Sequence, residues 1–581
     1  MTISYNWLCE YIPVNIAPKK LAVILTSLGL EVENFEQTET VKGSLEGLVI
    51  GHVLEVEKHP NADRLRLTTV DTGSEKPLQI VCGAPNVAVG QKVVVAPVGA
   101  TIYPVKGSPV TMKVATIRGI ESYGMICAED ETGLGHNHDG IMVLSDTAIP
   151  GAPAAEYFRL QSDWIYEIGL TPNRMDAMSH LGVAKDVCAY LSVHEGKDYP
   201  VQYPYNSSFK KERQGAVMEV TIENPKACER YSGVLIENIT IAESPEWLQQ
   251  RIRSIGLRPI NNIVDITNFI LHETGQPLHA FDADQITGNA IIVKNLPEGT
   301  PFITLDEKER KLHTGDLMIC NGKGEPMCFG GVFGGLHSGI TPGTKNIFLE
   351  SAWFNPVTIR KTAFRHNLRT DAAARFEKGV DISNTVTVLE RAAMLIKELA
   401  GGAIASDITD VYPDPKAKKQ VVLAYAYLKK LSGKTYHPGM VKKILTHSGF
   451  EVIREDKDTI QVAVPFSKPD FALPADIVED IMRVDGYDNV AIPVSITISP
   501  SVETRSYQEA LKEKIANYLS GNGFNEIFTN SITNSAYFDE ATLRTSVKML
   551  NSLSAGLNIM RPSMLETGLE CLAHNINHKN N

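Results

Sequence analysis

RPINNIVDITNFILHETGQPLHAFD, residues 258–282, sets polar side chains into an apolar run that is long enough to be buried. An unsatisfied polar group inside a protein costs about 1–3 kcal/mol, so these side chains must find partners. The polar residues concerned are Asn261, Asn262, Asp265, Thr267 and Asn268. The pattern predicts that they hold either the following loop, residues 273–277, or a ligand.

The same stretch ends on a histidine in a constrained backbone. His279 follows Pro277, which cannot donate a backbone hydrogen bond and biases Gln276 away from the helical region. We therefore expect an extended or turn conformation, from which the imidazole of His279 can point out of a rigid frame. From spacing alone, the stretch is equally well explained as a helix and turn in which the polar side chains and the histidine have only structural roles.

Composition limits the class of protein. The 581 residues are 43% hydrophobic and 21% charged, which is typical of a water-soluble chain of three to five domains. The formal charge of −12 argues against a surface that binds nucleic acid throughout, because phosphate contacts need many Lys and Arg residues. Eight scattered cysteines without a CxxC pair, no signal peptide and no long apolar stretch predict a cytoplasmic protein with no membrane segment.

The first 155 residues change pattern near residue 42. Residues 1–41 show an apolar stripe at helical spacing that Gly29 ends, whereas 42–155 contain short strand patterns separated by Gly, Asn and Asp turns. The second pattern predicts a small antiparallel barrel. Its candidate phosphate contacts are Arg64, Arg66, Lys113 and Arg118, each of which is equally well explained as a solvated surface charge.

Residues 210–400 carry glycine-rich stretches at 330–335 and 339–343, neither of which matches a phosphate-binding loop. Gly334 predicts a close approach of a ligand, because glycine is chosen where a Cβ would clash. Glu350 follows an apolar strand pattern and can hold an ammonium group. No Ser–His–Asp or Cys–His constellation is evident, so any hydrolysis would use an oriented water. We expect Cys320 and Cys328 to be core thiols.

Residues 405–490 combine a basic run with a set of acids. Eight lysines have no acidic residue among them, which makes the run either a solvated face or an RNA-facing patch: Lys416, Lys418, Lys419, Lys429, Lys430, Lys434, Lys442 and Lys443. Pro474 can open a helix that places Asp476, Glu479 and Asp480 on one face, with Asp470 just before it. Such acids suit Mg²⁺, and equally suit the positive end of a helix dipole.

These segments, taken together and in order, resemble the β subunits of bacterial phenylalanine–tRNA ligases. The resemblance rests on residues 258–282, GGVFGG (330–335), NIFLESAWF (346–354) and LRTDAAARFEKGVD (368–381), and it extends over the whole chain. It implies a multidomain α+β fold with these parts: an N-terminal helical segment (1–41), a tRNA-binding oligonucleotide-fold barrel (42–155), a helical connector (156–209), an α+β editing domain (210–400), a small winged, metal-binding α+β domain (405–490) and the start of a class II synthetase-like core (495–581).

The resemblance also implies functional roles. The family's editing module hydrolyses tyrosine that is wrongly attached to tRNA(Phe), and the matching positions are Arg258, His279, Gly334, Glu350, Thr370 and Ala372. Its D-x5-D-x2-E-E set binds Mg²⁺ and corresponds to Asp470, Asp476, Glu479 and Asp480, with the shorter Asp480 in place of the last Glu. An α subunit would use ATP to attach phenylalanine, in an α2β2 tetramer with tRNA(Phe) as the shared substrate.

The resemblance further implies that residues 495–581 are an incomplete, catalytically silent pairing module, so that the sequence is truncated at its C-terminus relative to the family. Two other functions stay open. A stand-alone aminoacyl-tRNA deacylase would need only residues 210–400, and would be active without an α subunit. A non-enzymatic RNA-binding scaffold would bind tRNA with a strong salt dependence and would hydrolyse no ester.

Overall fold

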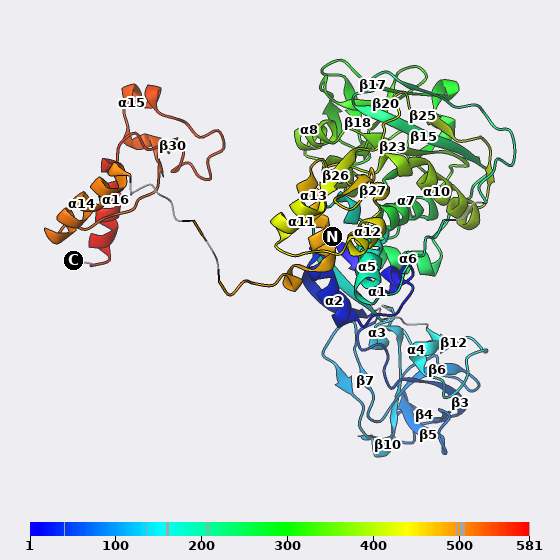
Figure 1. Cartoon of the computed structure of the whole chain (residues 1–581). Coiled ribbons are helices and arrows are strands. Elements are labelled where there is room, and N and C mark those ends of the chain that lie inside the picture. Colours follow the sequence, from blue (N-terminus) through cyan, green and yellow to red (C-terminus); the bar gives the residue numbers. More distant parts are fainter. Residues whose placement is uncertain are drawn as a thin grey trace. The chain divides into compact units, whose positions relative to one another are not determined.

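The computed structural model describes residues 1–39, 41–135, 137–158, 162–205, 208–495, 498–499 and 506–579 (Figure 1). Two compact units make up the chain, Met1–Ala491 and Ile492–Asn581. Across the described ranges, no helix combines the length and the apolar character that crossing a membrane requires.

The N-terminal segment is a mixed α/β element and not the helical piece that its apolar stripe predicted. Helices α1 (Tyr5–Leu8) and α2 (Pro18–Ser27) are present, and Gly29 follows α2 with a φ of +76°. Strands β1 (Thr2–Ser4) and β2 (Glu31–Glu39) flank β13 (Ser162–Gly169) in a three-stranded sheet. The strand β2 was missed because its residues, EVENFEQTE, are mostly polar and become ordered by pairing with a strand more than 120 residues away.

Residues 48–153 form a curled antiparallel sheet with strand order β11-β6-β3-β4-β5, in which β12 also pairs with β6. The strands are β3 (Val49–Lys58), β4 (Arg66–Asp71), β5 (Leu78–Cys82), β6 (Lys92–Pro97), β11 (Gly124–Ile126) and β12 (Val143–Leu144). The amide of Tyr123 donates to the Gln79 carbonyl at 2.9 Å and that of Val81 to Ser122 Oγ at 3.0 Å. These bonds bring the two ends of the strand order together, as a barrel requires. The remaining strands form two small hairpins: β7 (Thr101–Ile102) with β8 (Val110–Thr111), and β9 (Ala115–Ile117) with β10 (Ile120–Ser122).

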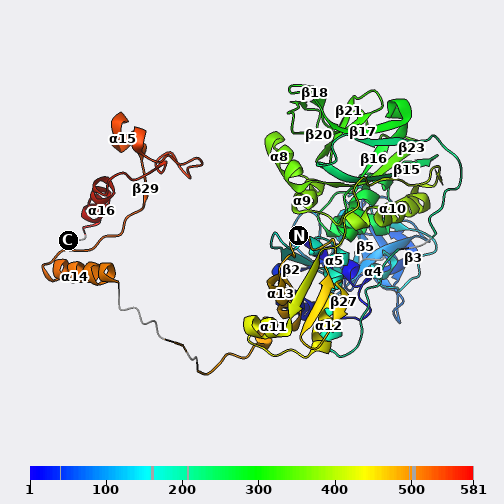
Figure 2. The same cartoon turned by 45° about the horizontal axis from the view of Figure 1, so that its top comes forward.

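Two facing sheets build the next module, drawn mainly in green in Figures 1 and 2. One sheet has the order β14-β17-β20-β21-β22, with strands Glu219–Ile222, Ala290–Asn295, Leu317–Asn321, Pro326–Phe329 and Phe333–Gly334. The other has the order β16-β23-β15-β24, with β25 also on β15, and its strands are Leu278–Asp282, Asn346–Phe354, Cys228–Glu237, Ala403–Ile404 and Thr409–Val411. A further hairpin joins β18 (Pro301–Ile303) and β19 (Glu309–Lys311).

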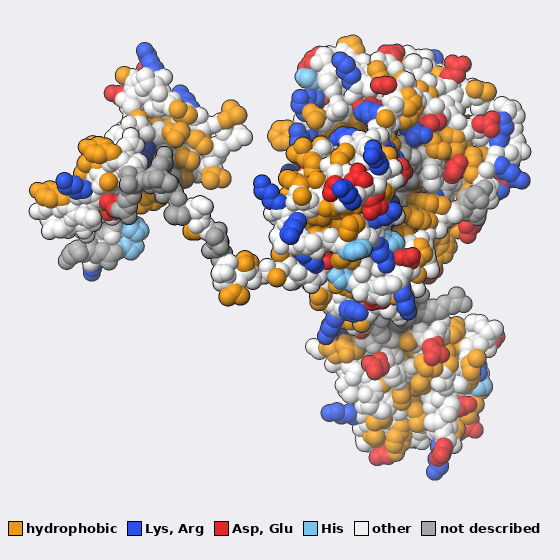
Figure 3. Space-filling view, viewed as in Figure 1, with side chains coloured by type: hydrophobic (Ala, Val, Ile, Leu, Met, Phe, Trp, Pro, Cys, Tyr) orange, Lys and Arg blue, Asp and Glu red, His pale blue; other side chains and the backbone are white. Residues whose placement is uncertain are grey.

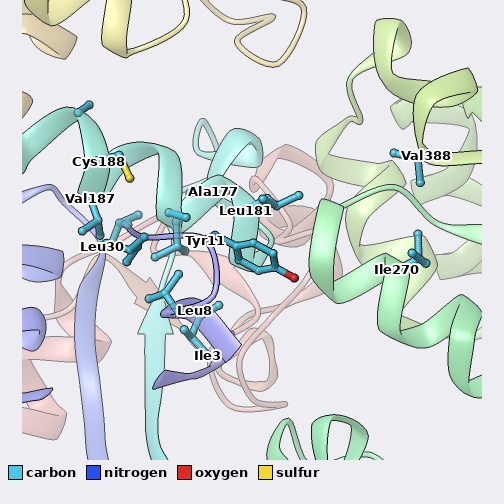
Figure 4. Close-up of a cluster of buried hydrophobic side chains, with 14 of the residues drawn as sticks. Ile3, Leu8, Tyr11, Leu30, Ala177, Leu181, Val187, Cys188, Ile270 and Val388 are labelled. Carbon is cyan, nitrogen blue, oxygen red and sulfur yellow. The ribbon is translucent and has the colours of Figure 1, made fainter. Parts of the chain in front are cut away.

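Strand β23 lies between two hydrophobic cores. Its side chains alternate between them, because successive side chains of a strand point to opposite faces. Ile347 and Leu349 belong to the larger core, which helices α7 (Asn262–Thr274) and α10 (Thr385–Ala400) cover. In Figure 4, Ile270 of α7 and Val388 of α10 point toward each other within this core. Phe348, Ala352 and Phe354 belong to the second core, between the two sheets. Glu350 therefore lies in a row of apolar side chains.

Helices complete this first unit. They are α3 (Glu129–Thr132), α4 (Ala154–Tyr157), α5 (His180–His194), α6 (Glu246–Ser254), α8 (Pro356–His366) and α9 (Asp371–Lys378). A small domain follows, in which a sheet of order β26-β28-β27 carries three helices. Its elements are β26 (Gln420–Ala424), α11 (Tyr425–Ser432), α12 (Pro438–His447), β27 (Glu451–Glu455), β28 (Thr459–Ala463) and α13 (Pro474–Asp485). Helix α5 packs against α12 and α13 and so joins this domain to the larger core.

The second unit buries little of its own apolar surface. It contains α14 (Tyr507–Gly521), α15 (Glu540–Thr545) and α16 (Leu565–Asn577), with β29 (Ile532–Thr533) paired to β30 (Ile559–Met560). Large apolar side chains such as Phe528, Leu550 and Leu553 are more than 90% exposed, and Figure 3 shows hydrophobic side chains gathered on the visible face of this unit. Exposed apolar surface on this scale is typical of an interaction face.

Candidate functional site

His279 and Glu350 lie opposite each other on neighbouring strands. In the antiparallel pairing of β16 with β23, His279 is the direct partner of Glu350, and on the other side Glu350 pairs with Gly233 of β15. Directly opposite residues of an antiparallel pair point to the same face of the sheet. The sheet therefore brings together two side chains that are 71 positions apart in the sequence.

Glu350 is a buried carboxyl group with one hydrogen-bond partner. Its side chain is 5% exposed, and its Oε2 accepts a hydrogen bond of 2.7 Å from the hydroxyl of Tyr231. Burial raises the pKa of Glu350 to about 8, although the hydrogen bond from Tyr231 acts in the opposite direction. The sequence had placed Glu350 at the end of a strand, whereas β23 continues to Phe354 and encloses it.

His279 supplies a neutral imidazole. Strand β16 gives it the extended backbone that Pro277 predicted. Burial lowers the pKa of His279 to about 4, and its Nε2 is buried without a hydrogen-bond partner among the described residues. A neutral imidazole nitrogen that the protein leaves unpaired can bind a water molecule or a polar ligand atom.

Gly334 belongs to the same site because it faces His279. A Cβ at this position would lie 2.8 Å from Leu305 Cδ1 and 3.1 Å from His279 Cε1, so a larger residue would press on the imidazole. Thr370 is the N-cap of α9, where its hydroxyl accepts from the amide of Ala373 at 3.1 Å and donates to the carbonyl of Val332 at 2.9 Å. Thr370 thus fixes the chain that leads into Gly334.

For two of the predicted site residues, Ala372 and Arg258, the structure shows no contact with His279 or Glu350. Ala372 is half-buried in the first turn of α9, and Arg258 is exposed in the segment before α7. For Arg258 the described part of the chain provides no hydrogen bond or ion pair. Their roles rest on the resemblance.

Of the five polar residues, Asn261, Asn262 and Asp265 form hydrogen bonds within the fold, and none of these bonds reaches the loop 273–277. Asn261 caps the helix by accepting from the amides of Ile263 and Val264, and Asn262 donates to the carbonyl of Thr240 at 2.9 Å. Asp265 accepts from Ser244 Oγ at 2.5 Å. These contacts hold the segment before α6 against α7. They are the structural role for the polar residues that the spacing had left open as an alternative.

The cysteines near the site are buried thiols. Burial raises the pKa of Cys320 to about 11 and raises that of Cys328 well above its ordinary value. A thiol held in the protonated form is a poor nucleophile. The expectation that both are core residues is confirmed, since both lie in the core between the two sheets.

The four candidate magnesium ligands do not converge. Asp470 and Glu479 are exposed, and Asp476 Oδ2 accepts from the amides of Ala472 at 2.8 Å and Leu473 at 2.7 Å. Asp480 Oδ1 instead pairs with lysine and arginine side chains. No group of three or more potential ligands forms a metal site within the described ranges. As arranged here, these residues do not fit a magnesium ion.

Asp480 belongs to a buried network of ion pairs. Its Oδ1 lies 3.3 Å from Lys468 Nζ and 2.7 Å from Arg483 Nη2. Burial alone would raise the pKa of Asp480, but Lys468 and Arg483 lower it to about 2. The other members are Arg174, Asp176 and Asp186. This network joins the helical connector to the small domain.

The barrel leaves its candidate phosphate contacts unpaired. Arg64, Lys113 and Arg118 are exposed, and Arg66 is half-buried with its Nη1 lacking a partner. In the described barrel, none of the four forms an ion pair. Asn61 Nδ2 donates to the carbonyl of Arg118 at 3.1 Å, which brings the loop that carries Arg64 next to the turn that carries Arg118.

Carboxylates from elsewhere in the chain neutralise most of the lysine run. These ion pairs could not be predicted from the sequence, because the partners lie outside the run. Among the described residues, five of the eight lysines form ion pairs with carboxylates from elsewhere in the chain: Lys416 with Glu229, Lys418 with Glu451, Lys434 with Asp485, Lys442 with Glu455 and Lys443 with Asp198. The absence of acidic residues within the run did not predict the partners that folding supplies. Its use as an RNA-facing patch is correspondingly weakened.

Comparison with known proteins places four family models on the chain. They are described as a putative tRNA binding domain (residues 48–153), a B3/4 domain (227–401), a tRNA synthetase B5 domain (421–487) and a phenylalanyl tRNA synthetase beta chain CLM domain (492–581). The candidate site lies in the second, and the ion-pair network reaches into the third.

The relatives that match the chain over its whole length include the following three. Each is a phenylalanine–tRNA ligase beta subunit: that of Bacteroides thetaiotaomicron is 50% identical and that of Porphyromonas gingivalis 47%, each aligned over all of this chain and 71% of the relative. That of Salinibacter ruber is 39% identical over all of this chain and 70% of the relative. The chain thus spans about 70% of the length of these proteins.

Proposed function

Because the chain belongs to the family of phenylalanine–tRNA ligase β subunits, we propose that the site around Glu350 removes wrongly attached tyrosine from tRNA(Phe). As a member of this family it is part of a heteromeric ligase, it works with an α subunit, and it binds tRNA. The specific assignment concerns which residues of this chain perform the editing reaction.

The observation that supports the editing assignment most strongly is the burial of Glu350. A carboxyl group enclosed in an apolar row, with a pKa raised to about 8, destabilises the fold at neutral pH. Groups with strongly shifted pKa values concentrate at functional sites, because a destabilising residue is kept in a protein when its function requires that residue. Beside it lies the unpaired Nε2 of His279, a second polar group without a partner among the described residues.

Together these groups fit a hydroxylated aromatic side chain. An apolar pocket that accepts phenylalanine cannot strongly reject tyrosine, whereas a second site that hydrogen-bonds the phenol selects tyrosine. In our proposal Glu350 binds the phenol or the amino group of the substrate, and Gly334 and Ala372 leave room for the ring. An attached phenylalanine has no hydroxyl and would leave Oε1 of the buried Glu350 carboxyl group without a hydrogen bond, which is unfavourable.

Hydrolysis would proceed by direct attack of water. The buried, protonated thiols of Cys320 and Cys328 argue against a covalent intermediate. The neutral imidazole of His279 would position the water through Nε2. Thr370 donates its hydroxyl proton to Val332, so it can act on water only as an acceptor. Arg258 would meet the end of the tRNA.

The other parts of the chain are given supporting roles in the proposal. Arg64, Arg66, Lys113 and Arg118 would contact tRNA phosphates, and the exposed apolar face of the second unit would pair with the α subunit in a cytoplasmic α2β2 tetramer. Ligases of this kind generally use Mg²⁺, and the α subunit would use ATP. The assignment of Mg²⁺ to Asp470, Asp476, Glu479 and Asp480 stays a prediction, and no step depends on it.

The test is the release of tyrosine from tyrosyl-tRNA(Phe) by the complex with the α subunit. We expect Glu350→Ala to lower the rate at least tenfold, while Glu309→Ala, which removes an exposed carboxylate of the same module, leaves the rate unchanged. Equal rates for the wild type and Glu350→Ala would refute the assignment. Full activity without the α subunit would favour the stand-alone deacylase, and tRNA binding without any hydrolysis would favour the scaffold.

A further inference from the structure

Among the described residues, Tyr231 is the one that donates a hydrogen bond to the side chain of Glu350, and sequence reasoning did not find it. It lies on β15, is 0% exposed, and donates its hydroxyl to Glu350 Oε2 at 2.7 Å. It is also the only tyrosine between residues 206 and 411. A fully buried phenol needs a hydrogen-bond partner, and Glu350 is the partner that the structure provides.

The strand positions of this pair are fixed by the packing around it. Tyr231, Gly233 and Leu235 alternate with Val234 and Ile236, so the first three face the core between the two sheets. Gly233 pairs directly with Glu350, and a Cβ at Gly233 would lie 2.2 Å from the ring of Phe348.

The ring of Phe348 thus fills the space that the glycine leaves, beside the carboxyl group. A residue with any side chain at 233 would displace that ring. The strand packing therefore leaves Glu350 little freedom to move away from the hydroxyl of Tyr231.

The hydrogen bond uses one carboxyl oxygen of Glu350 and leaves the other for a ligand. Oε2 accepts from Tyr231, and the described residues provide no hydrogen bond to Oε1. A carboxyl group held by one oxygen presents the second in a fixed direction. A phenol in the pocket can donate to that oxygen, whereas a phenyl ring cannot.

We propose that Tyr231 is a positioning residue that sets the selectivity of the site by orienting Glu350 toward the hydroxyl of the misattached amino acid. This inference rests on the proposed editing function and names the residue through which Glu350 discriminates. Tyr231 does not touch the substrate in this proposal. Its hydroxyl acts only through the carboxyl group, which distinguishes it from a second binding group.

In the described part of the chain, no charged group faces Glu350 that could take the place of Tyr231. The titratable groups that face it are His279 from β16, Cys228 and Tyr231 from β15, and Cys328 from β21. Burial lowers the pKa of His279 to about 4 and raises the pKa of Tyr231 and of both thiols well above their ordinary values. All four groups are therefore neutral at pH 7, and the hydroxyl of Tyr231 is the hydrogen-bond donor to the carboxyl group of Glu350.

The experiment uses the complex with the α subunit and the variant Tyr231→Phe, which keeps the ring and removes only the oxygen. We measure kcat and KM for hydrolysis of tyrosyl-tRNA(Phe) and phenylalanyl-tRNA(Phe). Because the carboxyl group of Glu350 loses the hydrogen bond that orients it, we expect the ratio of the two kcat/KM values to fall about tenfold. Tyr412→Phe is the matched control: its hydroxyl accepts from the amide of Lys416 at 3.0 Å, away from Glu350.

Two further readouts separate positioning from a general structural role. If Tyr231 acts through Glu350, then Tyr231→Phe should add no further loss of selectivity to a Glu350→Gln variant, because the two effects are not additive. The hydrogen bond from Tyr231 opposes the rise in the pKa of Glu350, so its removal should move the midpoint of the pH dependence of selectivity to higher pH.

Each outcome decides the proposal. Unchanged selectivity, losses that add in the double variant, or an unshifted pH midpoint would overturn the role of Tyr231 while leaving the editing function intact. A wild-type complex that releases no tyrosine would instead overturn the editing function itself. If Tyr231→Phe failed to fold, Glu350→Gln alone would test the proposal. The amide oxygen of the glutamine can still accept from Tyr231, but the group offered to the phenol of the substrate is changed. Retained selectivity in Glu350→Gln would therefore refute the mechanism.

Discussion

Replacing Glu350 with glutamine should make the protein more stable than the wild type, and this difference in stability should grow as the pH rises. The carboxyl group of Glu350 is buried, and burial raises its pKa from the ordinary 4.5 to about 8. A raised pKa means that the folded state favours the protonated form, so its stabilising effect is complete below pH 4.5 and is lost as the pH rises through 8. Glutamine has nearly the same shape, cannot ionise, and can still accept the hydrogen bond from Tyr231.

The magnitude follows from the size of the pKa change. Each pKa unit corresponds to about 1.4 kcal/mol, so the free energy of unfolding of Glu350→Gln relative to the wild type should rise by about 3 kcal/mol between pH 4.5 and 7. It should level off at about 5 kcal/mol above pH 8. For a cooperative unit of 491 residues, 1 kcal/mol shifts Tm by about 1 °C, which gives shifts of about 3 °C and 5 °C.

The assay is thermal unfolding of both proteins in matched buffers from pH 5 to pH 9, followed by calorimetry. The expected result is a difference in Tm that grows between pH 5 and 8 and then stays constant. Glu309→Gln, which changes an exposed carboxylate of the same module, should show a difference that does not vary with pH. A Glu350→Gln difference that is equally flat would show that Glu350 ionises as an ordinary surface carboxylate, and the argument from its burial would be wrong.

Three further changes test other parts of the account. Gly334→Ala should lower tyrosine release at least tenfold in a deacylation assay, because the new Cβ would lie 2.8 Å from a neighbouring leucine, whereas Gly343→Ala, with no contact closer than 3.8 Å, should have no effect; equal rates for the two variants would contradict the close approach. Asp480→Asn should lower the free energy of unfolding by about 3 kcal/mol in denaturant titrations, equally with and without Mg²⁺, because it disrupts buried ion pairs; a loss that appears only with Mg²⁺ would restore the metal assignment. Arg64→Ala combined with Arg118→Ala should weaken tRNA binding and reduce the slope of log K against log salt by about 2 in a filter-binding series, while an unchanged slope would remove these residues from the interface.

The fold was predictable where local pattern and tertiary environment agree. Turn residues between short strands predicted the antiparallel sheet of the first domain, and Pro277 predicted the extended backbone at His279. The strand at residues 31–39 was not predictable from its own residues, because pairing with β13 orders a largely polar segment.

The site was predictable only in part from the sequence, and mainly through resemblance. Pairing of β16 with β23 brings His279 to Glu350, and no spacing rule connects these two positions. Tyr231 was missed because its partner is 119 residues away, although the only tyrosine between residues 206 and 411 was a usable signal. Asp480 was assigned to a metal through the resemblance, and neither the resemblance nor the helical spacing shows that Lys468 and Arg483 are packed against it.

The central claim is that the site formed by His279 and Glu350 receives the amino acid of a misacylated tRNA. The most direct measurement is a crystal structure of the complex with the α subunit, soaked with a non-hydrolysable amide analogue of 3′-tyrosyl-adenosine. The account predicts a phenol oxygen within about 3 Å of the Glu350 carboxyl group and the amide carbon beside His279 Nε2. An analogue bound elsewhere on the chain, with Glu350 still enclosed and unligated, would contradict it.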